Sequence, residues 1–270
     1  MKRILLLLIL PSFIFSCTTV PGIGRSQFAP IPAGQMLSMS IDQYAKVIKT
    51  AKISKDQKTT AMVRRVGQKI ATAVEDLLRE EGVTMDFEWE FNLIDDNKQA
   101  NAWCMPGGKI AVYTGILKYT VDETGLAVVM GHEVAHAVAR HGNERMTRAL
   151  GISLVGMGLG IALDGNQHAG IFLAAFGAGA NFGIQMPFGR SQESEADRLG
   201  LLLMARAGYN PEKAVDFWGR MSAGSKNTTP EFLSTHPSHE TRITDLEKYM
   251  PDALLYYFPK LRAPSITPYE

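Results

Sequence analysis

Two histidines four residues apart constrain this chain more than any other feature of its sequence. The pentapeptide HEVAH at positions 132–136 places His132 and His136 one turn apart on the same face of a helix. Two imidazoles at that spacing can hold a single zinc ion from a rigid support. Glu133 lies beside them, where its carboxylate can take a proton from a water molecule and return it to a leaving group. The pentapeptide therefore predicts a metal-dependent hydrolytic site.

The residues around this pentapeptide are apolar and predict a buried helix. Residues 127–130 and 137–139 contain only alanine, valine and methionine. We expect a helix from about Asp122 to His141, with Gly142 as its C-terminal cap. A helix of this composition would bury the site and shield it from bulk water.

A zinc ion with two histidine ligands and an open coordination position needs one further protein ligand. Metzincins place Gly and His at the third and sixth positions after the second histidine, but Ala139 and Gly142 stand there, which excludes that arrangement. His141 is one residue short of the sixth position. Near the end of its helix it is expected to face solvent or the helix carbonyls. The remaining candidate is a carboxylate from the acidic segment ESEAD at residues 193–197.

The rest of the sequence predicts helices around a small sheet. Apolar residues recur at the spacing of a helix or alternate at the spacing of a strand, and two glycines can supply the positive φ angles of a tight hairpin. The predicted elements are helices at 40–52, 55–81 and about 191–207, a strand at 86–94, and a hairpin of residues 100–105 and 109–113. We therefore expect an α+β fold, mostly helical with a small antiparallel sheet, in one catalytic domain over residues 35–270.

Residues 150–186 form two Gly-rich apolar stretches separated by a short polar segment. Neither stretch reaches the length that spans a bilayer. They are predicted either as small-residue helices packed closely in the core or as a lid or membrane-contacting segment beside the site. The sequence leaves both possibilities open.

The N-terminus reads as a secretion signal that ends at a cysteine. Lys2 and Arg3 precede an apolar run, and the residues Ile-Phe-Ser before Cys17 are similar to a bacterial lipobox. We expect a signal peptide at 1–16, a lipid on Cys17 that anchors the chain in a membrane, and a tether at 17–34. The alternative is an ordinary cleaved signal with a chance cysteine. Thr18 follows the cysteine instead of an aspartate, which favours a Gram-negative outer membrane and a periplasmic location.

Charge and cysteine content exclude two other classes of protein. The formal charge is +1, from 28 basic and 27 acidic residues, so no basic surface for a nucleic acid is expected. The two cysteines, Cys17 and Cys104, offer no disulfide framework. Cys104 is interpreted as a buried apolar residue.

Together these motifs resemble the HExxH gluzincin family of zinc metallopeptidases that includes the prenyl-protein CAAX protease, HtpX, BepA and LoiP. The resemblance covers nearly the whole mature chain and is closest to a short LoiP-like lipoprotein. It implies one Zn²⁺ per chain, with Glu193 as the third ligand and Asp197 orienting a zinc-bound histidine. Glu195, about 200° further round the helix, is then expected to be a solvated or salt-bridged acid. Further segments carry the resemblance, namely GRSQ at 24–27, NAWCMPGG at 101–108, YTG at 113–115 and STHPSH at 234–239.

The resemblance also assigns residues around the metal. Asn101 and Ala102 would lie on a strand beside the cleft, where an extended substrate can add as a further strand. His236 would approach the zinc as a fourth ligand or stabilise the transition state, with a rigid Thr-His-Pro turn as the alternative. Arg242 would pair with a carboxylate near the site or with the substrate.

The expected function is that of a zinc endopeptidase acting on misfolded or stalled envelope proteins, with His236 as a gate. The first alternative is a periplasmic chaperone or assembly factor with a latched, largely structural zinc site. A second is hydrolysis of a non-peptide bond such as a cell-wall amide. Loss of activity on Glu133→Gln, with fold and metal retained, would distinguish a peptidase from a pure binding module.

Overall fold

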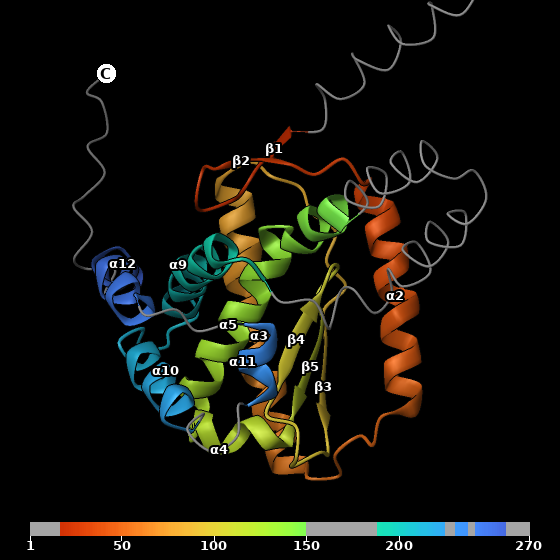
Figure 1. Cartoon of the computed structure of the whole chain (residues 1–270), viewed down its shortest axis with the longest axis vertical. Coiled ribbons are helices and arrows are strands. Elements are labelled where there is room, and N and C mark those ends of the chain that lie inside the picture. The colour runs from red at the N-terminus through yellow and green to blue at the C-terminus, as the bar shows by residue number, and fades with distance from the viewer. Residues whose placement is uncertain (1–16, 150–187, 225–229, 237–240, 258–270) are drawn as a thin grey trace, which may run out of the picture.

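The computed structural model describes residues 17–149, 188–224, 230–236 and 241–257 (Figure 1). Over these residues the chain is mostly helical with two small sheets, which confirms the predicted α+β class. The predicted signal peptide at 1–16 and the Gly-rich residues 150–186 lie outside the described residues. The elements are β1 (Cys17–Thr19), β2 (Ser26–Phe28), α2 (Ala33–Thr50), α3 (Gln57–Glu80), β3 (Glu90–Ile94), β4 (Ala102–Met105), β5 (Lys109–Tyr113), η1 (Thr114–Ile116), α4 (Leu117–Thr120), α5 (Glu123–Val138), α9 (Arg190–Arg206), α10 (Lys213–Gly224), α11 (Glu231–Thr235) and α12 (Arg242–Tyr257).

The larger sheet has the strand order β3-β5-β4, so β4 forms an edge (Figure 1). The predicted hairpin is confirmed: β4 pairs antiparallel with β5, and Gly107 and Gly108 between them have φ angles of 82° and 80°. The sheet is mixed and not wholly antiparallel, because β3 pairs in parallel with β5. The hairpin places β5 between the other two strands, so β3 and β4, which run in opposite directions, never meet. The predicted antiparallel pairing holds for β4 with β5 and for β1 with β2, and β3 adds to the larger sheet in parallel.

Helix α5 is the centre of the molecule and carries the HEVAH pentapeptide. Every residue from Gly125 to Val138 is buried, with α3, α9 and β4 packed around the helix. The crossing with α9 is unusually close, because a Cβ atom on Gly200 would lie 3.0 Å from the backbone nitrogen of His132. A Cβ on Gly131 would meet the Gly200 carbonyl oxygen at the same distance. These two glycines let the backbones of the two helices approach, which brings their polar side chains into one site.

The N-terminal segment, where the sequence predicts a tether over residues 17–34, contains two short strands and contacts α9 through Arg25. Strands β1 and β2 form a two-stranded antiparallel sheet, and Val20 and Gln27 are buried. Helix α2 then begins at Ala33, within the predicted tether and before the predicted helix start. Val20 and Ala29 are buried, so folding of this segment removes from water apolar surface that a solvated segment would expose. No described helix is both long and apolar enough to cross a membrane.

Candidate metal centre

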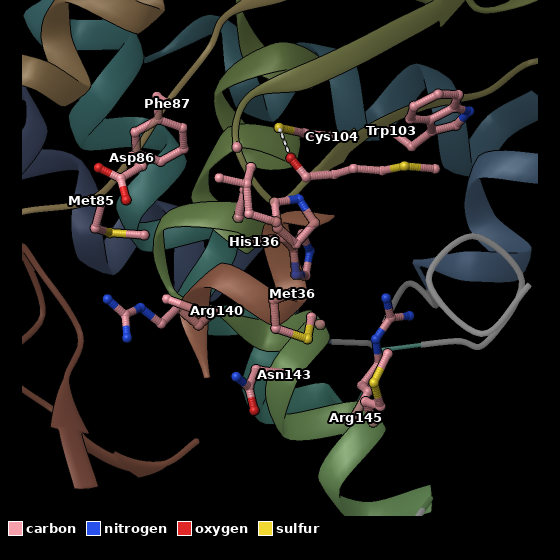
Figure 2. A pocket seen from close by; sticks show the side chains of 18 of the residues that line it. Met36, Met85, Asp86, Phe87, Trp103, Cys104, His136, Arg140, Asn143 and Arg145 are labelled. Atoms are coloured by element: carbon pink, nitrogen blue, oxygen red, sulfur yellow. Dashed lines mark hydrogen bonds between the residues drawn. The ribbon is translucent and has the colours of Figure 1, made fainter. Parts of the chain in front are cut away.

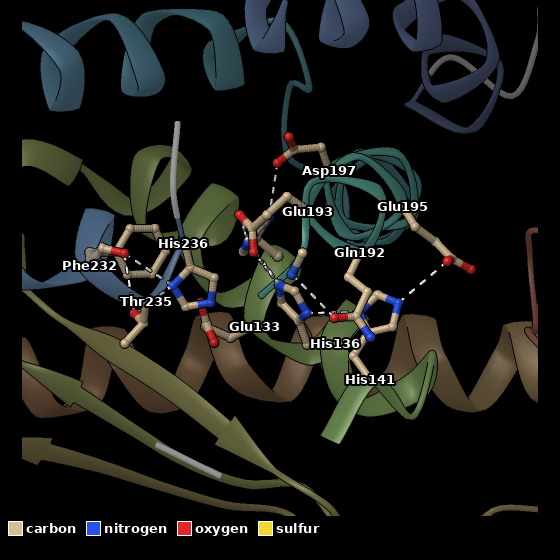
Figure 3. A network of polar contacts seen from close by, with 12 residues as sticks. Glu133, His136, His141, Gln192, Glu193, Glu195, Asp197, Phe232, Thr235 and His236 are labelled. Atoms are coloured by element: carbon tan, nitrogen blue, oxygen red, sulfur yellow. Dashed lines mark hydrogen bonds and ion pairs between the residues drawn. The ribbon is translucent and has the colours of Figure 1, made fainter. Parts of the chain in front are cut away.

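Four buried side chains from α5, α9 and the end of α11 converge on one point, and Figure 3 shows three of them, His136, Glu193 and His236. One ligand atom from each of His132, His136, Glu193 and His236 lies within 4.8 Å of the others. The Nε2 atoms of His132 and His136 are 3.1 Å apart. The Glu193 carboxylate lies 3.6 Å from the first of these atoms and 3.4 Å from the second. Three imidazoles and one carboxylate form a donor set that zinc prefers.

Unsatisfied polar atoms within this cluster support a cation site. Glu193 Oε1 and His236 Nε2 are buried and make no hydrogen bond among the described residues. A buried polar atom without a partner costs free energy, and a cation accepts the lone pairs of both atoms. The arrangement therefore fits a metal ion better than an ordinary hydrogen-bonded core.

Burial keeps the two histidines His136 and His236 neutral. Desolvation lowers the pKa of both rings well below the usual histidine value, and the neighbouring His132 acts in the same direction. A neutral imidazole has a free lone pair on one ring nitrogen, which is the form that binds a metal.

Glu133 lies beside the four converging side chains and next to the edge strand β4. Its Oε1 atom is 3.3 Å from His236 Nε2, and both side chains are almost fully buried. Burial raises the pKa of Glu133 well above its usual value, and the charge of Glu193 adds to the effect. A hydrogen bond from the backbone of Cys104 in β4 acts in the opposite direction. A carboxyl group with a raised pKa, placed between the ligands and the edge strand, is suited to proton transfer.

A buried arginine closes the His132 side of the centre. Arg242 Nη2 donates to Glu193 Oε2 at 2.5 Å and Arg242 Nε donates to Asp197 Oδ2 at 2.7 Å. The guanidinium stacks 3.6 Å from the ring centroid of Trp218. Asp197 Oδ1 in turn lies 3.0 Å from His132 Nδ1. Sequence reasoning expected one carboxylate partner for Arg242, and the structure provides two.

The two acids on α9 respond to these surroundings in opposite ways. Burial raises the pKa of Glu193, although the charges of His132 and Arg242 oppose it. Burial alone would also raise the pKa of Asp197, but the charge of Arg242 and the interaction with His132 outweigh it, so this pKa is lowered. Asp197 is therefore charged at neutral pH, as an acid that orients a histidine must be.

His141, on the opposite side of the centre, does not lie where the sequence predicts. This residue was expected to face solvent or helix carbonyls, but it is fully buried and its Nδ1 atom lies 2.8 Å from His136 Nδ1. The reason is local: α5 ends at Val138, and Arg140 adopts a left-handed φ of 53°, which turns the chain back under the site. Glu195 contacts His141 and forms an ion pair with Arg25, as expected of a salt-bridged acid.

The predicted substrate strand lies next to the site, and a cavity opens beside it. Asn101 and Ala102 are buried at the start of β4, the edge strand. A cavity of about 160 Å³ lies between β4, His136 and the N-terminal end of α2 (Figure 2). Its lining is mainly apolar and includes Met36, Met85, Phe87, Trp103, Met105, Met146 and Phe188, with Arg140, Asn143 and Arg145 as polar members.

Sequence reasoning missed several residues that touch the centre, among them Phe188 and Arg145. The ring of Phe188 stacks on His136 with centroids 3.7 Å apart, and the Arg145 guanidinium lies 3.6 Å from the Phe188 centroid. Neither residue has a periodic signal that would place it beside a histidine. Cys17, the predicted lipidation site, is exposed at the start of β1, remote in sequence from the centre.

Comparison with known proteins identifies relatives across most of the chain. Residues 64–250, which include the whole cluster, match the sequence profile of peptidase family M48. The mitochondrial metalloendopeptidase OMA1 of Schizosaccharomyces pombe is 39% identical over 170 residues, which cover 62% of this chain and 48% of that protein. The beta-barrel assembly-enhancing protease of Escherichia coli K12 is 28% identical over 244 residues, 87% of this chain and 48% of that protein. This chain thus spans about half the length of the curated relatives that it matches.

Proposed function

Since the chain belongs to peptidase family M48 and is a metalloprotease, we propose that it is a zinc endopeptidase of the bacterial cell envelope that hydrolyses misfolded or stalled envelope proteins. The observation that carries the proposal is the convergence of His132, His136 and Glu193 on one point, with Glu133 beside them and an edge strand alongside. The name of the beta-barrel assembly-enhancing protease of E. coli supports an envelope role.

In the proposed mechanism, His132, His136 and Glu193 hold one zinc ion. Zinc bound there supplies Lewis acidity, which activates a water molecule and polarises the substrate carbonyl. Glu133 takes one proton from the attacking water, whose hydroxyl adds to the carbonyl carbon. Glu133 then delivers that proton to the amine nitrogen as the carbon–nitrogen bond breaks.

His236 gates this site in our proposal. Its Nε2 atom is 3.3 Å from Glu133 Oε1 and lies among the other candidate ligand atoms, so it could serve as a further ligand to the metal. Movement of the ring away from these atoms would open the site to a substrate carbonyl. The same ring, or Arg242 on the neighbouring helix, can then stabilise the developing oxyanion.

The substrate binds as an additional strand on β4, beside Asn101 and Ala102, with a large apolar side chain in the adjacent cavity. Main-chain hydrogen bonds to an edge strand hold any extended chain, which suits unfolded clients. The cavity volume is about 160 Å³, and an engineered protein cavity of about 150 Å³ holds benzene. Methionines in the lining adapt to different apolar shapes. We therefore expect one phenylalanine, leucine or methionine side chain to fill it, and misfolded proteins expose such side chains.

The proposed location rests on the N-terminal residues. The lipobox-like sequence before Cys17 predicts a lipoprotein of the Gram-negative outer membrane facing the periplasm. Relatives in mitochondria show that similar chains also work elsewhere. Incorporation of labelled palmitate that is lost in Cys17→Ala would support the anchor, and unlabelled wild-type chain would contradict it.

The decisive experiment measures metal content and cleavage of unfolded casein by the chain starting at Thr18. We expect close to one zinc per chain and a loss of about 10²–10⁴-fold in cleavage rate for Glu133→Gln, with zinc retained. His236→Ala should raise cleavage if the ring closes the site. Bound zinc without cleavage by any form would favour the chaperone function. Release of cell-wall amides without casein cleavage would favour the non-peptide alternative.

A second experiment tests the apolar cavity. Peptides that differ only in one residue next to the scissile bond, phenylalanine against aspartate, should differ in kcat/KM by at least about tenfold in favour of phenylalanine. Equal kcat/KM values at every position on both sides of the bond would contradict the proposed binding of a side chain in this cavity.

A further inference from the structure

We propose that His141 and Glu195 are positioning residues for His136, and that Arg25 extends this support to the N-terminal sheet. The inference rests on the proposed zinc site, because it assigns a role toward one of its ligands. It gives Arg25, in the segment GRSQ at 24–27, a role in supporting the centre. It also gives a purpose to a buried histidine that the proposed mechanism does not use.

The contacts form one continuous network from the centre to the surface, and Figure 3 shows its inner members His136, His141 and Glu195. His136 Nδ1 is 2.8 Å from His141 Nδ1, and His141 Nε2 is 3.4 Å from Glu195 Oε2. Arg25 Nε donates to the same Glu195 oxygen at 2.7 Å. His141 is fully buried and the Glu195 side chain is 8% exposed, whereas the Arg25 side chain is 37% exposed.

Only one assignment of donors and acceptors satisfies all of these contacts. If His136 binds zinc through Nε2, which faces Glu193, its Nδ1 atom carries the proton. That N–H donates to His141 Nδ1, which must then be the unprotonated nitrogen of a neutral ring. His141 Nε2 consequently carries a proton and donates to the Glu195 carboxylate. Each group therefore fixes the tautomer and the orientation of the one before it, as outer partners of metal-bound histidines do.

Arg25 connects three parts of the chain that are distant in sequence. It binds Glu195 on α9 and also donates from Nη1 to Glu144 at 2.8 Å, within the helical residues 141–149. Gln192 on α9 donates to the same Glu144 at 2.7 Å. The N-terminal sheet is thereby tied to both segments that carry His141 and Glu195. The segment next to the predicted lipid anchor is thus part of the scaffold of the centre.

The test compares zinc affinity in wild type, His141→Phe and Glu195→Gln, by competition with a chelator at fixed pH. Phenylalanine keeps a planar ring but cannot accept from His136, so we expect zinc binding to weaken about 10–100-fold. Glu195→Gln keeps the shape and an acceptor oxygen, so its effect should be smaller and in the same direction. The visible absorption spectrum of the cobalt(II) form should shift in both variants, because it reports ligand geometry independently of activity.

Arg206→Ala provides the matched control. Arg206 lies on the same helix α9, 11 residues beyond Glu195, and makes two hydrogen bonds to Glu80, at 3.0 and 2.8 Å. Losing these contacts should lower the melting temperature but leave the zinc Kd within about twofold and the cobalt spectrum unchanged, as expected of a distant and independent site.

Each outcome decides the proposal. A folded His141→Phe variant with wild-type zinc affinity and cobalt spectrum would overturn it. If His141→Phe does not fold, Glu195→Gln decides alone, and an unchanged cobalt spectrum there has the same consequence. A wild-type chain that binds no zinc would overturn both this inference and the proposed function. Bound zinc without peptide cleavage would contradict only the proposed function, because zinc affinity is still measured.

Discussion

The two histidines of the HEVAH pentapeptide are supported in different ways on their two sides. On one side, which we call the Asp197 side, His132 meets a carboxylate directly, and that carboxylate is held by Arg242. On the other, the Glu195 side, a second imidazole stands between His136 and its carboxylate. The first network ends in the core against Trp218, and the second ends at the surface with Arg25.

The contacts that support His132 and those that support His136 should therefore contribute differently to the stability of the protein. The side chains of His132, Asp197 and Arg242 are all at most 2% exposed, so the charges of Asp197 and Arg242 interact with little screening by water. Breaking such a buried pair typically costs about 3–5 kcal/mol. Ion pairs with exposed members contribute about 0–1 kcal/mol. Substitutions on the Asp197 side should therefore lower the free energy of unfolding strongly, and substitutions at the outer end of the Glu195 side should lower it only slightly.

The largest effect is expected for Arg242→Met. This change leaves the carboxylates of Glu193 and Asp197 buried without their cation, so the free energy of unfolding of the zinc-free protein should fall by about 3–5 kcal/mol. Urea denaturation measures it. Arg242→Lys keeps a charge but loses the planar fork, and should fall between wild type and Arg242→Met. A loss below about 1 kcal/mol for Arg242→Met would show that the Asp197 side is not the more strongly coupled one.

The second prediction compares the Asp197 side with the Glu195 side by zinc affinity. Asp197→Asn keeps the size of the side chain but removes the charge that orients His132, and should weaken zinc binding about 10–100-fold. Glu195→Gln is the matched variant on the other side, where an imidazole intervenes, so its loss should be smaller. Competition with a chelator gives both constants. A larger loss for Glu195→Gln would reverse the proposed order of the two sides.

The sequence predicts the Asp197 side much better than the Glu195 side. The spacing of His132 and His136 is a local helical period, and the resemblance to a family supplied Glu193 and Asp197 from one short motif. His141, in contrast, is buried only because Arg140 adopts a left-handed φ of 53° after the end of α5. No pattern of apolar residues signals that turn, because arginine is not a residue typical of left-handed backbone.

Long-range pairing explains the remaining differences. Glu195 finds Arg25, which lies 170 positions earlier in the chain, and no local period could indicate that contact. Alternation predicts a strand at 86–94, of which 90–94 form β3, but alternation does not say on which side of the hairpin a strand adds or in which direction it runs. Its parallel pairing with β5 therefore emerged only in three dimensions.

A smaller effect is expected for Arg25→Ala at the outer end of the Glu195 side. Because the Arg25 side chain is 37% exposed, its ion pairs should contribute at most about 1 kcal/mol to the free energy of unfolding. High salt screens such pairs, so the difference between wild type and variant should shrink from 0.05 to about 1 M NaCl. The loss in Arg242→Met should persist over the same range. Salt dependence that is equal for both variants would remove the distinction between a buried and an exposed network.

The smallest effect concerns the pH dependence of the Arg25 contribution. Burial alone would raise the pKa of Glu144, but hydrogen bonds from Arg25 and Gln192 outweigh it and lower this pKa below 4.5. A carboxyl group whose pKa is lowered by folding adds stability above its unfolded pKa and loses it as the pH falls through the folded value.

The difference in unfolding free energy between zinc-free wild type and Arg25→Ala should therefore be complete at pH 6 and decrease as the pH falls below about 4.5. The same comparison in a Glu144→Gln background isolates the carboxyl group, because glutamine does not titrate. If the difference between the two Arg25 forms depends on pH as strongly in that background, Glu144 is not the carboxyl group through which Arg25 adds this stability.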